Sequence, residues 1–453
     1  MIKRYSNIPE EGVKNVVGFE AYRVVIPLKK ALILGDGKVI DNLYNHHIFI
    51  GAGEMSTVAS PLWGGIDEEQ RRGNHEMEIL MGIYSRRLFD LLLTDDIFSN
   101  VGSVDIRRLQ REFMSLGGFK FTDGTEVQKL VEVQVKAPFP SALAVNEAIA
   151  QRLNIVDYLD NAFSDSETSL FLPYDRQRQF HPALTIGGKT ELKDANDGME
   201  TYGKRRSMKF KIGTMGIEQD YKNITSILDA HKDVLFIMDN NQAYTPETCK
   251  ELMDKLDHGG YLKRLLFMEQ PFNVGEEIEG MKVFKDYLKR GFKISLDESV
   301  ADSSDVARLG KGFREYLDED QMRNIVIVPK IEKGGIIEVV EMAYQAKKYN
   351  FVLSPSTLTG NPGQVAFFYQ LFTRMDNVLT YPGDDKALIA EANGVQTYKN
   401  TVGRKLFGNP RSTIHQTKDQ SLAPYDPNSI GIHPAAKLID KRSPLVQGPI
   451  FIV

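Results

Sequence analysis

The chain has 453 residues, and its 56 lysines and arginines stand against 61 acidic residues, which gives a net charge of −5. This length exceeds one ordinary hydrophobic core, so we expect two domains, and the absence of a basic surplus argues against a nucleic-acid partner. The single cysteine, Cys249, permits no internal disulfide, and the sequence contains no uncharged apolar run of roughly 18 residues, which a membrane helix needs. We therefore expect a soluble, cytoplasmic protein without a membrane partner.

The first 130 residues mix strand-like and helix-like patterns. Residues 20–29 and 46–54 are typical of an antiparallel pair of strands, and residues 74–93 carry apolar side chains at helical spacing. We interpret residues 1–130 as an α+β domain. We expect residues 391–453, which are rich in proline, asparagine and serine, to pack back on it.

Residues 131–390 show the alternation of short apolar runs and longer helical segments that βα units produce around a parallel sheet. Eight runs are predicted as strands, at residues 183–186, 207–212, 234–238, 265–268, 293–296, 325–329, 351–354 and 378–381. An eight-stranded (β/α) barrel of the TIM type fits this pattern, and its active site is expected where the strands end.

Five charged residues lie at the ends of successive predicted strands: Lys211, Asp239, Glu269, Asp297 and Lys330. Consecutive members are separated by roughly one βα unit of about 30 residues, so all five should converge on the mouth of the barrel. Acidic residues at strand ends often only cap helices, but three at equivalent positions favour a shared site.

The three carboxylates would repel one another in a half-buried site unless a cation lay between them. A hard divalent ion with oxygen ligands, Mg²⁺, fits best. Lys209 and Lys211 are two residues apart on one strand and therefore share a face. Two adjacent ammonium groups lower each other's pKa, which would make one of them available as a base.

The motifs "KFK" (209–211), "DNNQAY" (239–244), "EQP" (269–271), "DES" (297–299) and "KIEKGG" (330–335), taken in order, resemble the enolase superfamily, in particular its muconate cycloisomerase-like branch. The resemblance implies a modified (β/α)8 barrel with an α+β N-terminal capping domain. A branch similar to mandelate racemase would place a histidine near the end of the seventh strand, and residues 351–363 contain none.

The resemblance also implies roles for individual residues. Asp239, Glu269 and Asp297 would bind one Mg²⁺ per subunit, with Mn²⁺ as a substitute, and Asn241 and Glu298 would support that site. Lys211 and Lys330 would face the α-carbon of a small carboxylate substrate from opposite sides, and Lys209 would stabilise the enediolate that proton removal creates. Residues 32–45 and the segment around Trp63 are expected to close the barrel mouth, and we expect a homo-oligomer.

The sequence leaves the reaction open among epimerisation or racemisation, dehydration and cycloisomerisation. The alternative is a catalytically inactive metal-binding barrel that serves as a binding or assembly protein. Lys333 is a rival to Lys330 if the sixth strand ends later than predicted.

Overall fold

The computed structural model describes most of the chain: residues 19–33, 39–50, 56–62, 68–92, 105–356, 371–391 and 446–452, apart from short gaps at 119, 121, 123, 125, 128, 164–169, 176 and 187–189. In this part of the chain, no helix combines the length and apolar character needed to cross a membrane.

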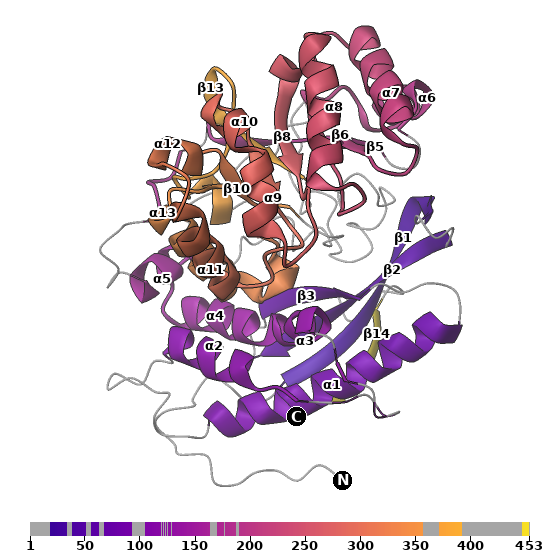
Figure 1. Ribbon diagram of the computed structural model, residues 1–453. Coiled ribbons are helices and arrows are strands. Elements are labelled where there is room, and N and C mark those ends of the chain that lie inside the picture. Colours follow the sequence, from indigo (N-terminus) through magenta and orange to yellow (C-terminus); the bar gives the residue numbers. More distant parts are fainter. Residues whose placement is uncertain are drawn as a thin grey trace, which may run out of the picture.

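An antiparallel sheet of four strands, in the order β14-β1-β2-β3, forms the base of the molecule in Figure 1. Its strands are β1 (Phe19–Ile33), β2 (Val39–Ile50), β3 (Ser56–Leu62) and β14 (Val446–Ile452). The last of these brings the end of the chain back beside β1. The described part of the expected loop 32–45 is strand, because β1 runs to Ile33 and β2 begins at Val39; Trp63 lies outside the described residues.

Five helices follow this sheet in the chain: α1 (Glu68–Leu92), α2 (Ile106–Ser115), α3 (Lys129–Lys136), α4 (Pro138–Ala150) and α5 (Ile155–Ala162). Asparagine and aspartate side chains fix two of their N-termini, since Asp105 accepts from the Arg108 amide and Asn154 from the Asp157 amide. Helix α4 contacts both β3 and α13 (Gly335–Lys348), so it lies between the antiparallel sheet and the barrel.

The upper part of Figure 1 is a parallel sheet of seven strands that follow one another in sequence order. They are β5 (Leu184–Ile186), β6 (Ser207–Lys211), β7 (Leu235–Asp239), β8 (Leu265–Glu269), β9 (Ile294–Leu296), β10 (Ile325–Ile327) and β11 (Val352–Leu353). These are the first seven strands that the sequence predicts.

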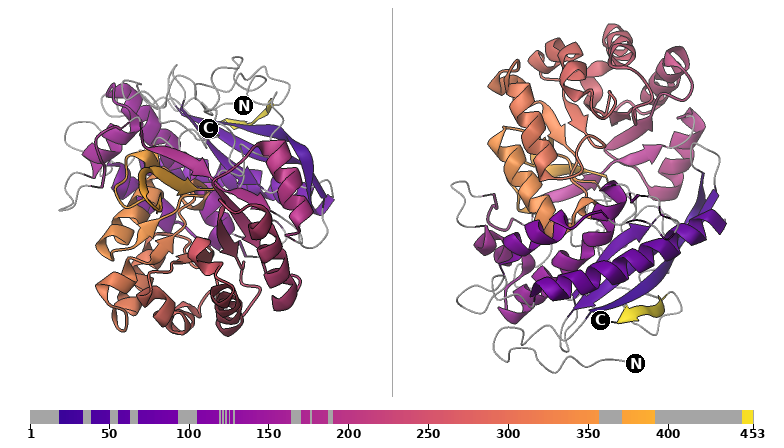
Figure 2. Two further views of the ribbon diagram at one scale, coloured as in Figure 1. Left: turned by 90° about the horizontal axis from the view of Figure 1, so that it is seen from above. Right: turned by 60° about the horizontal axis from the view of Figure 1, so that its bottom comes forward.

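Helices surround the parallel strands on their outer side, as the two views of Figure 2 show. Besides α13 they are α6 (Leu192–Tyr202), α7 (Ile217–Ala230), α8 (Pro246–His258), α9 (Glu277–Val283), α10 (Lys285–Lys289), α11 (Ser303–Arg314) and α12 (Glu319–Met322). The long interval between Asp297 and Lys330 is accounted for by α11 and α12. Phe210 of β6 is fully buried and stacks on Phe236, as expected for a side chain that points away from the mouth.

The eighth predicted strand begins beside the seventh, since Val378 forms a parallel bridge with Leu353 of β11, but its pairing further along needs correction. Residues 380–381 form β12, which belongs to a separate sheet of three strands in the order β12-β13-β4. Here β12 pairs antiparallel with β13 (Asp384–Ala390), which runs parallel to β4 (Gln179–Pro182). Residues 387–390 are apolar, as is most of 378–381, and the turn between these two runs includes Gly383, with φ of 76°. The sequence pattern alone therefore did not show which of the two strands ends at the mouth.

Backbone hydrogen bonds connect this small sheet to both edges of the large one. The Leu379 amide donates to the Leu353 carbonyl of β11 at 2.7 Å, and the Ala183 amide, just before β5, donates to the Ala390 carbonyl at 3.0 Å. The small sheet therefore bridges the two edges, and the strand ends of both sheets can contribute to one site.

Candidate active site

The five charged residues expected at strand ends lie where the sequence places them. Lys211, Asp239 and Glu269 are the last residues of β6, β7 and β8, and they are neighbours in register across these strands. Asp297 follows β9 directly, and Lys330 comes three residues after β10. The order across five adjacent strands is therefore Lys, Asp, Glu, Asp, Lys.

Lys209 lies at the centre of this row and is 3% exposed. Its Nζ is 2.7 Å from Asp239 Oδ2 and 2.8 Å from Glu269 Oε1, and it also pairs with Glu391. Burial would lower the pKa of Lys209, but attraction by the three carboxylates outweighs it and raises that pKa well above its usual value. The expectation that the lysine pair lowers this pKa is wrong, because it ignored the acids.

The carboxylates respond differently to the same environment. Burial raises the pKa of Asp239, but the ammonium groups of Lys209 and Lys211 outweigh burial and lower it. The pKa of Glu269 is raised well above its usual range, first by burial and then by repulsion from Asp239, against which Lys209 compensates only in part. Glu269 is therefore the acid of the row whose ionised form its surroundings stabilise least.

Lys211 is the accessible lysine of the pair, with 34% of its side chain exposed. It pairs with Asp239, and its Nζ donates to Asn241 Oδ1 at 2.6 Å. The side-chain Nδ2 of Asn241 in turn donates to Glu298 Oε1 at 2.9 Å, and the backbone amide of Asn241 donates to Asp239 Oδ1 at 3.1 Å. Asn241 thus contacts the row of charges directly, and Glu298 contacts Asn241.

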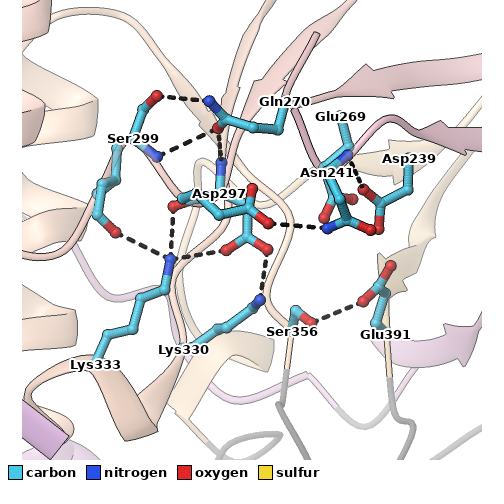
Figure 3. Close-up of polar contacts among 12 residues, drawn as sticks. Asp239, Asn241, Glu269, Gln270, Asp297, Ser299, Lys330, Lys333, Ser356 and Glu391 are labelled. Carbon is cyan, nitrogen blue, oxygen red and sulfur yellow. Dashed lines mark hydrogen bonds and ion pairs between the residues drawn. The ribbon is translucent and has the colours of Figure 1, made fainter. Parts of the chain in front are cut away.

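Asp297 is held by two lysines at once (Figure 3): Lys330 Nζ is 2.5 Å from its Oδ2, and Lys333 Nζ is 2.7 Å from its Oδ1. Burial raises the pKa of Asp297, but the two ammonium groups reverse this and lower it far below its usual range. Burial lowers the pKa of Lys330, but the Asp297 and Glu269 carboxylates together outweigh burial and raise it. Both lysines therefore reach Asp297, and the choice of Lys330 over Lys333 stays a prediction.

Two further residues of the site, Gln270 and Glu391, were not predicted from the sequence. Gln270, fully buried, accepts from the Asp297 and Ser299 amides and donates to Ser299 Oγ at 2.7 Å. Glu391, the residue directly after β13, pairs with Lys209 and accepts from Ser356 Oγ at 2.9 Å (Figure 3). The apolar run 387–390 that ends in this acid was the available signal, and the misplacement of the eighth strand concealed it.

The donor chemistry of the row fits magnesium, which prefers carboxylate oxygens. Asp239 and Glu269 already share one cation, the ammonium of Lys209, and a second cation beside Glu269 would offset the repulsion between these two carboxylates. Across the described residues, however, no three histidine, cysteine or acidic side chains lie close enough together to hold a metal ion as they stand. Lysine ammonium groups occupy the positions between the acids, and a metal would have to displace some of these ion pairs.

Comparisons with known proteins agree with this architecture. Residues 192–385 match the family model of the enolase C-terminal domain-like proteins. A stretch of 144 residues is 27% identical to an L-Ala-D/L-amino acid epimerase of Populus trichocarpa and spans 31% of each chain, so less than a third of that relative is matched.

Two solved structures show the same fold over nearly the whole chain. A dipeptide epimerase from Enterococcus faecalis V583, complexed with Mg and L-Leu-L-Tyr, has a TM-score of 0.63 at 16% identity, covering 92% of this chain and 99% of its own. A mandelate racemase/muconate lactonizing protein from Herpetosiphon aurantiacus has a TM-score of 0.64 at 14% identity, covering 93% and 98%.

These findings confirm the predicted fold class, an α/β protein with a TIM-like barrel and an N-terminal α+β part. They also support the enolase-superfamily resemblance of the motifs. They do not distinguish the muconate cycloisomerase-like branch from the epimerases and racemases.

Proposed function

We propose that this protein is a magnesium-dependent enzyme that removes the α-proton of a small carboxylate substrate. The observation that carries the proposal is the order Lys211, Asp239, Glu269, Asp297, Lys330 across five adjacent strand ends, with acids in the middle and a lysine on each side. A protein that only bound a metal would need the acids but not the two flanking lysines.

Asp239, Glu269 and Asp297 would hold the metal, and Asn241 and Glu298 would orient Asp239 and Lys211 through the hydrogen bonds described above. Magnesium, or manganese in its place, would supply positive charge beside the substrate carboxylate as negative charge moves onto its oxygens. Lys209, buried between the acids, would add fixed positive charge to the same region.

Lys211 and Lys330 would exchange protons with the α-carbon. One neutral lysine takes the α-proton and becomes an ammonium group, while the other, as ammonium, returns a proton to the opposite face and becomes neutral. The carbon is inverted, no electrons leave the substrate, and no other reactant is consumed. We infer epimerisation or racemisation because the matched plant protein and one of the structural neighbours are named epimerases. Dehydration and cycloisomerisation would use the same first step.

Exchange in D₂O tests the proposal. The protein with Mg²⁺ should replace the α-hydrogen of at least one member of a panel of dipeptides, N-acyl amino acids and 2-hydroxy acids, as followed by NMR. EDTA should abolish this exchange. If no acid of the panel exchanges with the metal present, the inactive metal-binding barrel becomes the better description.

Single lysine variants assign the bases. Lys211→Ala should slow α-proton exchange from one enantiomer by about 10²-fold or more, and Lys330→Ala should slow exchange from the other enantiomer to a similar extent. The reason is that a base reaches only the hydrogen that points toward it. Lys289, in α10, is exposed, so Lys289→Ala is the control. This variant should exchange the α-proton of both enantiomers at the wild-type rate. Wild-type exchange in Lys211→Ala would contradict the assignment of the bases.

A further inference from the structure

Lys333 has contacts that differ from those of the other lysines at the barrel mouth. Its Nζ donates to the Asp297 carbonyl at 2.6 Å and the Val300 carbonyl at 3.0 Å, and it pairs with Asp297 Oδ1 at 2.7 Å. An ammonium group has three N–H donors, and these three acceptors use all of them. Lys333 is 5% exposed, and all three of its donors are used within the protein.

Besides Lys333, Asp297 contacts Gln270 and Lys330. Gln270 Oε1 accepts from the Asp297 amide at 3.0 Å and from the Ser299 amide at 3.3 Å, which fixes the backbone of the segment after β9. Lys333 fixes the carboxylate by engaging Oδ1, and Oδ2 is the oxygen that Lys330 meets. Oδ1 of Asp297 therefore binds Lys333, and Oδ2 binds Lys330.

The scaffold that carries Lys333 is itself held tightly. Lys333 ends a short 3-10 helix, Ile331–Lys333, and two glycines follow it. At Gly335 a Cβ atom would lie 2.1 Å from Ser141 Oγ and 2.4 Å from the Ala137 carbonyl of the neighbouring helical segment. The Ile336 amide donates to Ser141 Oγ at 3.0 Å, and Gln110 donates to the Gly334 carbonyl at 3.2 Å. The N-terminal helices thus fix the position from which Lys333 reaches Asp297.

We propose that Lys333 is a positioning residue that holds Asp297 in the orientation presenting Oδ2 to the barrel mouth. It contacts neither substrate nor reacting atoms and acts through Asp297. Loss of Lys333 removes a buried cation and frees Oδ1, so the carboxylate loses its fixed orientation and its charge is compensated by Lys330 alone. The expected effect on Mg²⁺ binding rests on the proposed function, whereas the contact between Lys333 and Asp297 does not.

The contact is tested in metal-free protein by a double-mutant cycle in urea. Lys333→Met, Asp297→Asn and the double variant are compared with wild type. We expect strong non-additivity, with the double variant unfolding at a higher urea concentration than the sum of the single shifts predicts, because Lys333 and Asp297 interact directly. The matched cycle of Lys289→Met with Asp297→Asn should be additive. Additivity in both cycles would overturn the proposal.

If Lys333→Met proves too unstable to purify, the double variant Lys333→Met/Asp297→Asn should still fold, because the carboxylate that the single change leaves poorly compensated is then uncharged. A double variant as unstable as Lys333→Met would show that Lys333 acts through something other than Asp297, which contradicts the proposal.

Calorimetric titration with MgCl₂ tests the positioning role. Lys333→Met should bind Mg²⁺ about 10- to 100-fold more weakly, the usual loss when a residue that orients a ligand is removed. Its α-proton exchange should return toward the wild-type rate at saturating Mg²⁺, whereas the exchange lost in Lys330→Ala should not. Unchanged Mg²⁺ affinity in Lys333→Met would contradict the positioning role. Absence of Mg²⁺ binding or exchange in wild type would instead refute the proposed function and leave the urea cycle as the test of the contact.

Discussion

At the scale of single residues, the site concentrates charge in a space that excludes water. Asp239, Glu269 and Glu391 are each at most 4% exposed, and all three contact the ammonium of Lys209. A buried charge is tolerated only with a partner, and removal of one partner leaves the others uncompensated. Lys209 is therefore a requirement for folding as well as a candidate participant in the chemistry.

Lys209→Met tests this requirement. We expect a loss of about 3–5 kcal/mol in the free energy of unfolding, the usual size when a buried ion pair loses one member. The control is Lys250→Met, which removes an exposed pair with Asp254 and should cost about 1 kcal/mol or less. Urea unfolding of metal-free protein measures both, and equal costs would show that the acids adapt without Lys209.

Glu338 gives a second prediction at this scale, away from the metal ligands. It is 8% exposed at the start of α13, where it accepts from the Ser303 amide at 2.6 Å, and burial raises its pKa above 4.5. Well below pH 4.5 the carboxyl is protonated in both the folded and the unfolded state. As the pH rises, the unfolded chain releases the proton first, so the free energy of unfolding falls until the pH exceeds the folded pKa.

Glu338→Gln keeps an oxygen for the Ser303 amide but cannot ionise. It should therefore raise the free energy of unfolding at pH 7 and leave it nearly unchanged at pH 4. Urea unfolding at the two pH values measures this, with the exposed Glu315→Gln as the control. A stabilisation of equal size at both pH values would show that the effect does not come from ionisation.

At the scale of elements, sequence reasoning succeeded where a buried strand ends in a charged residue. The runs before Asp239 and Glu269 are short and apolar, and Lys211 ends a short strand in which Met208 and Phe210 alternate with polar residues. A parallel sheet brings the ends of such strands together, so the positions of these charged residues could be predicted from the sequence. It failed at Glu391, since two apolar runs separated by a tight turn offered two candidates for one strand. The partners of Lys209 and Lys333 could not be predicted either, because contacts among side chains from different strands depend on register and rotamer.

The junction between Lys333 and α13 gives a prediction about an element. Gly335, with φ of 80°, lies where a side chain would meet Ser141 and the Ala137 carbonyl, whereas Gly383, with φ of 76°, has open space around it. Gly335→Ala should cost about 2–5 kcal/mol, the sum of left-handed strain and overpacking, and Gly383→Ala only about 1–2 kcal/mol of strain. Thermal or urea unfolding compares them, and equal costs would mean that α4 can move away from α13.

At the scale of the whole molecule, the larger of two hydrophobic clusters among the described residues joins the N-terminal helices to the barrel. It extends from Leu80 and Tyr84 of α1, through Phe139 of α4, to Ile336 and Val340 of α13. Arg107 of α2 adds an ion pair with Glu341, at 3.2 Å. The proposed division into domains at residues 130 and 390 stays a prediction, but the core shows that the N-terminal helices and the barrel are packed against each other and should unfold together.

Hydrogen exchange followed by mass spectrometry tests this coupling. Peptides from α4, which carries no proposed metal ligand, should open with the same free energy as peptides from α13. Because magnesium would bind only the folded barrel, Mg²⁺ at about 100 times its dissociation constant should slow exchange in both helices by about 100-fold, equivalent to about 2.7 kcal/mol. In Asp239→Asn this protection should disappear from both helices. Protection confined to α13 would show that the N-terminal helices open independently of the barrel, and that the continuous core does not make them one cooperative unit.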